Sequence, residues 1–260
     1  MPEVPLDDAV VHYDRTGDGP ALLLLHGTAA SREQWQPLTA KAAGFTVLAP
    51  DFPGSGRTTG HGGPIGVEDL AAQAEAVLGH AGFDRAHVAG HSLGGVVAAH
   101  LAGTRPHRVR SAVLHAAWPV TDVRQDAEFR YWLDLLALGA ATFARMLSLM
   151  AFGPRYWEQA TAESNEQLVK TLTEVIEPGA ARQIEADRRV DLRPVLGAIT
   201  APVLVLGSAH DRLITAEQQH ELVAAIPGAR LAWIDAGHGA PAELPEEFAR
   251  LVLDFVTAAP

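Results

Sequence analysis

The chain has 260 residues, of which 48% are hydrophobic and 20% charged, and its formal net charge is −11. These values are typical of a globular protein, and the length suits a single domain with a large core. The negative charge argues against a nucleic-acid partner, and the absence of cysteine excludes disulfides, thiolate zinc sites and a cysteine nucleophile.

The N-terminal residues 1–8 lack the basic region and the apolar stretch of a signal peptide. No apolar run further along the chain approaches the roughly 20 residues that cross a bilayer. We therefore expect a cytoplasmic protein without a membrane span. Its expected partner is a small-molecule substrate.

Short apolar runs between turn residues predict strands that are buried on both faces of a sheet. These runs are residues 21–25, 45–49, 86–89, 111–115, 202–206 and 230–234, with helical patterns at residues 67–81, 93–104 and 216–225. Strands that alternate with helices predict an α/β fold, with a mostly parallel sheet covered by helices on both faces. Residues 9–13 are expected to add a strand at the sheet edge.

The alternation stops over residues 118–195, which read as amphipathic helices and contain about half of the aromatic residues. We interpret this block as a helical cap inserted between two parts of the core domain, residues 1–117 and 196–260. Most of its aromatic side chains should form the core of the cap. Trp118, Phe129 and Trp132 are candidates for a substrate pocket between the cap and the sheet.

The run Gly90-His91-Ser92-Leu93-Gly94 lies between a predicted strand and a predicted helix. A sharp strand-to-helix turn needs small residues around its centre, and the glycines supply them. Such a turn exposes the serine hydroxyl at the carboxyl edge of the sheet, beside a helix N-terminus that favours developing negative charge. Ser92 is therefore the candidate nucleophile.

A serine nucleophile needs a base, and the base needs an orienting acid. His238 follows the last predicted strand, and Asp211 follows the strand before it, so both should lie at the same sheet edge as Ser92. Asp235 is a rival acid. Two backbone N–H groups are needed for an oxyanion hole, and Leu93 and Thr28 are the candidates. The direction of the Thr28 hydroxyl stays open.

These pieces resemble the α/β-hydrolase superfamily. The matching motifs are His26-Gly27, Asp51-Phe52-Pro53-Gly54-Ser55-Gly56, Gly90-His91-Ser92-Leu93-Gly94-Gly95, residues 202–211 and Gly237-His238. The resemblance implies a Ser92–His238–Asp211 triad, an oxyanion hole from the Thr28 and Leu93 amides, and no cofactor. Relatives that open epoxides or displace halide usually carry aspartate as nucleophile, so Ser92 argues against those two reactions.

The other polar motifs favour structural roles. The histidines show no helical pair with a neighbouring carboxylate, so no metal site is expected. His26 should fix the oxyanion loop, Asp51 should bond backbone amides in its turn, and His91 and His210 should be structural or solvent-facing.

The expected function is cleavage of a small-to-medium, largely apolar carboxylic ester, lactone or thioester through an acyl-enzyme on Ser92. The same triad could instead serve perhydrolysis, hydrolysis of a carbon–carbon bond or acyl transfer to an alcohol. A ligand receptor with vestigial catalysis is a further alternative, because this fold supports many functions.

Overall fold

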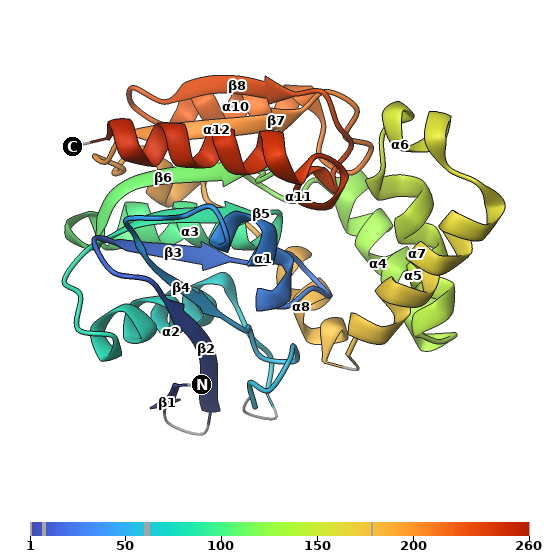
Figure 1. The fold of residues 1–260 in the computed structure, drawn as a ribbon, viewed down its shortest axis with the longest axis horizontal. Coiled ribbons are helices and arrows are strands. Elements are labelled where there is room, and N and C mark those ends of the chain that lie inside the picture. The colour runs from blue at the N-terminus through green and yellow to red at the C-terminus, as the bar shows by residue number, and fades with distance from the viewer. Residues whose placement is uncertain (1, 7–8, 60–62, 178, 260) are drawn as a thin grey trace.

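A computed structural model describes residues 2–6, 9–59, 63–177 and 179–259. These residues form an eight-stranded sheet with the order β1-β2-β4-β3-β5-β6-β7-β8 (Figure 1). The strands are β1 (Glu3–Leu6), β2 (Ala9–Thr16), β3 (Ala21–Leu25), β4 (Thr46–Pro50), β5 (Ala86–His91), β6 (Val109–His115), β7 (Val203–Ser208) and β8 (Arg230–Ile234). β2 pairs antiparallel with β1 and β4, and the remaining pairs are parallel. The predicted α/β fold is confirmed.

The edge of the sheet differs from the prediction. Residues 9–13 belong to β2, which lies inside the sheet between β1 and β4, and β1 takes the edge. In β1, Pro5 lies opposite Val10 in the antiparallel register. Proline cannot donate a hydrogen bond to a neighbouring strand, so an edge strand is the place that tolerates it.

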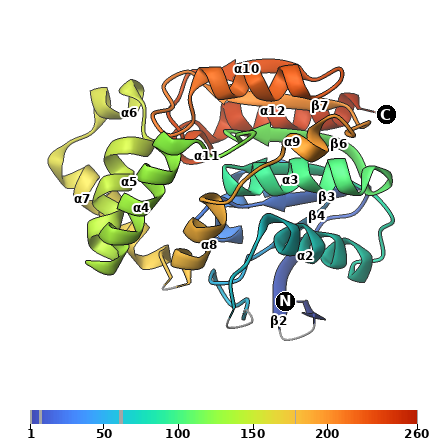
Figure 2. The same cartoon turned by 180° about the vertical axis from the view of Figure 1, so that it is seen from behind.

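Helices cover both faces of the sheet (Figures 1 and 2). One face carries α1 (Gln36–Thr39), α11 (Ala240–Glu243) and α12 (Pro245–Ala258), and the other carries α2 (Val67–His80), α3 (Leu93–Thr104), α9 (Arg193–Leu196) and α10 (Ala216–Ala225). Successive side chains of β3 point to opposite faces. Leu22 and Leu24 belong to the apolar cluster that contains Phe248 of α12. Leu23 and Leu25 belong to the cluster that contains α2 and α3.

A helical insertion, residues 123–187, lies between β6 and β7 at the end of the sheet toward which the parallel strands point (Figure 1). It contains α4 (Val123–Ala137), α5 (Ala140–Ala151), α6 (Pro154–Gln159), α7 (Ala162–Val175) and α8 (Ala180–Asp187). Its two ends meet at its base, where Val120 forms a β-bridge with Asp191 and the Leu192 N–H donates to the Pro119 carbonyl at 2.8 Å. The chain therefore leaves and re-enters the core at neighbouring points.

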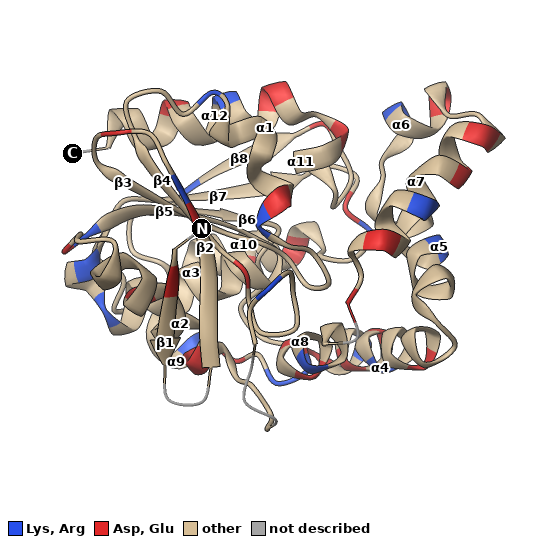
Figure 3. Cartoon of the chain, turned by 60° about the horizontal axis from the view of Figure 1, so that its bottom comes forward, with Lys and Arg blue, Asp and Glu red and all other residues tan. Residues whose placement is uncertain are grey.

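Charged residues are spread over the helices of the core and of the insertion, with acidic and basic positions intermixed (Figure 3). Within the described residues, no helix has the length and apolar character needed to cross a membrane.

Candidate active site

Ser92 occupies the turn between β5 and α3. Its φ of +54° lies in the left-handed region that side chains other than glycine rarely adopt. The turn is held in place because the Ser92 N–H donates to the His115 carbonyl of β6 at 2.9 Å. Strained backbone of this kind gathers at functional sites, where the surrounding structure maintains it.

Glycines allow this turn to pack against the neighbouring backbone. A Cβ atom on Gly94 would lie 2.0 Å from the carbonyl oxygen of Leu25, and one on Gly90 would lie 2.0 Å from the carbonyl oxygen of Gly94. Neither position has room for a side chain. The close approach brings the start of α3 against the loop that follows β3.

His238 and Asp211 meet at the carboxyl edge of the sheet. The His238 Nδ1–H donates to Asp211 Oδ2 at 2.9 Å, and both side chains are buried. The other carboxylate oxygen accepts from the N–H groups of Leu213 and Ile214, each at 2.9 Å. These bonds hold the carboxylate, and they place the proton of the neutral imidazole on Nδ1. Nε2 is then the basic atom of His238.

The rival acid Asp235 has other partners. Its carboxylate bonds His210 Nε2 at 2.9 Å and lies 3.8 Å from the Arg155 guanidinium. Its side chain is 62% exposed, against 3% for Asp211. Asp211, and not Asp235, is therefore the carboxylate that bonds the His238 ring.

The candidate oxyanion loop, residues 26–30, follows β3 and is anchored by His26. The ring accepts a hydrogen bond at Nε2 from the Phe52 N–H at 2.9 Å, so Nδ1 carries the proton and donates to the Gly27 carbonyl at 2.7 Å. Burial lowers the pKa of His26, in keeping with a neutral ring. The loop therefore has a fixed connection to the end of β4.

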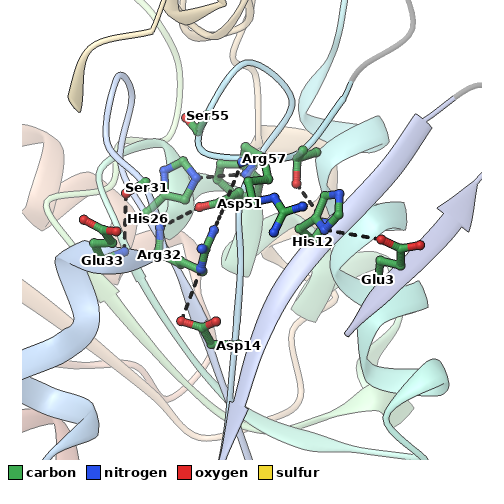
Figure 4. Close-up of polar contacts among 12 residues, drawn as sticks. Glu3, His12, Asp14, His26, Ser31, Arg32, Glu33, Asp51, Ser55 and Arg57 are labelled. Carbon is green, nitrogen blue, oxygen red and sulfur yellow. Dashed lines mark hydrogen bonds and ion pairs between the residues drawn. The ribbon is translucent and has the colours of Figure 1, made fainter. Parts of the chain in front are cut away.

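Asp51 joins Arg32, in the segment after the loop, to the turn after β4 (Figure 4). One carboxylate oxygen accepts from the Arg32 N–H at 2.8 Å, and the other pairs with the Arg32 guanidinium and accepts from the Arg57 N–H. Arg32 also reaches Asp14 of β2 at 3.2 Å. This network has Asp51 buried at its centre and supports the segment that follows the loop.

The structure places Thr28 and Ser92 on the wall of one cavity, and Leu93 begins α3 directly after the serine. The direction of the Thr28 hydroxyl, left open by the sequence, is set by Asp187 of α8. The hydroxyl donates to the Asp187 carboxyl at 2.7 Å. The Thr28 hydroxyl is therefore occupied by a contact with the insertion.

A chain of buried side chains lies beneath the site. His91 Nδ1 bonds His115 Nδ1 at 2.8 Å, and His115 Nε2 bonds the Ser208 hydroxyl at 3.0 Å. Burial lowers the pKa of His91 well below its usual value and that of His115 to about 3. The His91 ring also packs on that of His238, with centroids 4.8 Å apart. Both histidines are therefore neutral at pH 7 and tie β5, β6 and β7 together.

The cavity beside Ser92 has a volume of about 380 Å³. The core contributes Thr28, Ser92 and His238 to its wall, and the insertion contributes apolar side chains that include Trp132, Leu147, Phe152, Leu172 and Ile176. A cavity with one apolar wall and a few convergent polar groups suits a small ligand.

The three candidate pocket aromatics lie at different depths from the cavity. Trp132 lines the cavity, whereas Trp118 and Phe129 are absent from its wall and lie buried behind Trp132. The ring centroids of Trp118 and Phe129 are 5.8 Å apart, and those of Phe129 and Trp132 are 5.1 Å apart. Trp118 instead donates its Nε1–H to Thr121 at the base of the insertion.

Two polar residues of α8 that no sequence motif marks also reach this region. Gln183 accepts a hydrogen bond from the Ala29 N–H at 2.8 Å, and Asp187 accepts from Thr28 as described above. The two are four residues apart and so share one face of the helix. That spacing is the one signal that points to them. Within the described ranges, no group of three or more acidic or histidine side chains could hold a metal ion.

Comparisons with known proteins identify the family to which the chain belongs. A family model described as alpha/beta hydrolase fold matches residues 20–243. The chain is 34% identical to the pyrrolizixenacetamide deacetylase of Xenorhabdus hominickii, with 98% of each chain covered. It is 31% identical to the pimeloyl-acyl-carrier-protein methyl ester esterase of Xanthomonas campestris, covering 89% of this chain and 92% of the esterase. It also resembles the crystal structure of the enol-lactonase from Burkholderia xenovorans, at 26% identity and a TM-score of 0.85, over 98% of this chain and 100% of that chain. The chain belongs to the α/β-hydrolase family and is a hydrolase.

Proposed function

We propose that this protein is a serine hydrolase that cleaves a carboxylic ester, lactone or thioester through an acyl-enzyme on Ser92. The observation that carries the proposal is the convergence of Ser92, His238 and Thr28 on one cavity, with His238 oriented by Asp211. A nucleophile, a base with its acid, and an oxyanion loop are the parts that acyl transfer requires.

In the first half of the reaction, His238 Nε2 takes the Ser92 proton as the serine oxygen attacks the substrate carbonyl. The N–H groups of Thr28 and Leu93 stabilise the negative charge on the carbonyl oxygen. The carbon–oxygen or carbon–sulfur bond then breaks, and the imidazolium returns the proton to the departing alcohol or thiol. The acyl group remains on Ser92.

In the second half, His238 removes a proton from water, and the resulting hydroxide attacks the acyl carbon. The bond to Ser92 breaks, the serine recovers its proton from His238, and the carboxylic acid is released. Asp211 holds the imidazole and stabilises its charged form in both halves.

We further propose that the helical insertion acts as a cap, within the boundaries 118–195, and selects a small-to-medium, largely apolar acyl group. Trp132, Phe152, Leu172 and Ile176 support this preference, because they present apolar surface opposite Ser92. Burying more methylene groups against this wall stabilises the bound substrate by about 0.8 kcal/mol for each fully buried group. Turnover of nitrophenyl esters should therefore improve from acetyl to longer chains, and a flat or inverted series counts against the apolar pocket.

Hydrolysis of an amide is the second candidate. It is favoured by one relative, a pyrrolizixenacetamide deacetylase that is 34% identical to this chain. The same groups serve both reactions, since His238 can protonate a leaving amine as it does an alcohol. A matched panel of nitrophenyl esters and nitroanilides separates the two.

A serine-directed fluorophosphonate followed by mass spectrometry tests the nucleophile. The adduct is expected on the peptide that contains Ser92, and Ser92→Ala should lose both the adduct and activity. Full activity in Ser92→Ala with no adduct on the wild type would reject the proposal. Product analysis with competing alcohols and peroxide distinguishes hydrolysis from acyl transfer and perhydrolysis.

A further inference from the structure

We propose that Gln183 and Asp187, two buried side chains of α8 in the helical insertion, are positioning residues that hold the oxyanion loop in its reactive shape. The inference rests on the proposed roles of Ser92 and Thr28. It assigns the insertion a part in stabilising the transition state, in addition to forming the pocket wall.

The insertion bonds two consecutive residues of the loop. The Thr28 hydroxyl donates to Asp187 Oδ2 at 2.7 Å, and the Ala29 N–H donates to Gln183 Oε1 at 2.8 Å. Gln183 and Asp187 are both fully buried. A hydrogen bond shielded from water has no solvent competitor, so the position of α8 helps to determine the position of the loop, together with the bonds of His26.

The loop needs such support because its backbone is strained. Ala29 has a φ of +59°, in the left-handed region where a side chain is disfavoured. The bond to Gln183 holds the N–H of this residue. Without it, Ala29 can relax to an ordinary φ, and the adjoining Thr28 is displaced from its place beside Ser92.

Gln183 is itself fixed at its other end. Its Nε2 group donates to the Pro53 carbonyl at 3.1 Å and to the Ser55 hydroxyl at 2.9 Å, both in the turn after β4. The helix start and this turn also touch, since a Cβ on Gly54 would lie 2.6 Å from the backbone of Gly179. The amide oxygen of Gln183 is therefore aimed at Ala29 by two bonds on its nitrogen.

Asp187 suits a position behind the oxyanion loop because its full burial favours the uncharged form of the carboxyl. Its second oxygen, Oδ1, has no hydrogen-bond partner among the described residues, and burial raises its pKa well above the usual range. A carboxylate at this place would repel the negative charge that develops on the substrate. The neutral carboxyl instead accepts the Thr28 hydroxyl without that penalty.

The test compares Gln183→Leu, Asp187→Leu and Asp187→Asn with a matched control. In the control, Gln125→Leu removes another buried bond between the insertion and the core, in which the Gln218 amide donates to Gln125 Oε1 at 2.6 Å. For each protein, kcat and KM are measured with one nitrophenyl ester. The melting temperature and the rate of Ser92 labelling by a fluorophosphonate are measured alongside.

Both leucine variants should lose about 10- to 100-fold in kcat with KM within about threefold, because the loop acts on the transition state. Asp187→Asn keeps a neutral acceptor and should lose less than about threefold. Adding Ala29→Gly to Gln183→Leu should restore about threefold or more, since glycine adopts positive φ freely. Gln125→Leu should lower the melting temperature while its kcat stays within about twofold of wild type.

The proposal is overturned if both leucine variants keep wild-type kcat, or if Gln125→Leu loses as much kcat as they do. If Asp187→Leu does not fold, Thr28→Val breaks the same bond from the loop side and should show the same selective loss of kcat. Failure of the wild type to be labelled on Ser92 is a different result. It rejects the proposed function and not only the role of α8.

Discussion

Replacing Asp187 by asparagine should change how the stability of the protein depends on pH. The carboxyl is fully buried, one of its oxygens lacks a partner within the described residues, and burial raises its pKa well above the usual range. In the unfolded chain the same carboxyl titrates at about 3.9. Above that pH the unfolded state loses a proton that the folded state keeps. This carboxyl therefore lowers the stability of the wild type as the pH rises toward its folded-state pKa.

One proton that the folded state keeps and the unfolded state loses lowers the free energy of unfolding by about 1.4 kcal/mol for each pH unit. Asparagine is neutral at every pH and still offers an oxygen to Thr28, so the variant lacks this dependence on pH. The free energy of unfolding of Asp187→Asn minus that of the wild type should rise from pH 5 to pH 6, by up to about 1.4 kcal/mol while the folded carboxyl stays protonated. For a chain of this size, that is a relative shift in melting temperature of about 3 to 5 °C.

Urea unfolding at pH 5.0, 5.5 and 6.0, at constant ionic strength, measures this difference. Contributions from His91 and His115, whose pKa values burial lowers, are common to both proteins and cancel. Asp126→Asn is the control, because hydrogen bonds from Arg130 and Arg188 lower the pKa of Asp126. The Asp126 carboxylate stabilises the fold at every pH above the pKa that this group has in the unfolded chain, and the effect is lost only at lower pH. The difference in free energy of unfolding between Asp126→Asn and the wild type should therefore stay constant from pH 5 to pH 6. Parallel curves for Asp187→Asn and wild type would refute the reasoning, since they would mean that the folded carboxyl ionises normally.

Three further substitutions test the site. Gly94→Ala places a Cβ 2.0 Å from a carbonyl oxygen of β3 and should lower the free energy of unfolding in urea by about 2 kcal/mol or more. In the control Gly197→Ala, the new Cβ meets no atom within 4 Å, and the free energy of unfolding should stay nearly unchanged. Asp211→Asn should reduce kcat by about 10⁴-fold in steady-state assays, while Asp235→Asn should keep kcat within about twofold of wild type. Equal losses of kcat in the two variants would contradict the proposal that Asp211 orients His238. Trp132→Ala should lower kcat/KM roughly tenfold more for long acyl esters than for acetyl esters, and a uniform change across the series would exclude Trp132 from the acyl pocket.

Local patterns predict the elements that build the site. The helices at residues 93–104 and 216–225 and the strand at residues 21–25 appear with the predicted bounds, because each is marked by turn residues on both sides. The turn at Ser92 is also a local feature, since Gly90 and Gly94 are required wherever strand, turn and helix backbones meet. Glu3–Leu6 lacks such a pattern and is a strand because it pairs with β2.

The features that the sequence does not show depend on contacts between distant residues. Gln183 and Asp187 belong to an amphipathic helix, where polar side chains ordinarily face solvent. Their burial comes from loop residues 154 and 159 positions away along the chain. Phe129 and Trp132 are three residues apart on α4, so periodicity gives both the same face. Only the packing of the insertion shows that Trp132 lines the cavity and Phe129 lies behind it.

The acyl-enzyme itself is the most direct test of the proposed mechanism. The protein is mixed with a nitrophenyl ester, quenched in acid within the first turnover, digested and analysed by mass spectrometry. The acyl group is expected on the peptide containing Ser92, together with a burst of nitrophenol of about one equivalent of enzyme, and both should vanish in Ser92→Ala. An active wild type with no acylated Ser92 and no burst, matched by an equally active Ser92→Ala, would contradict the proposed function.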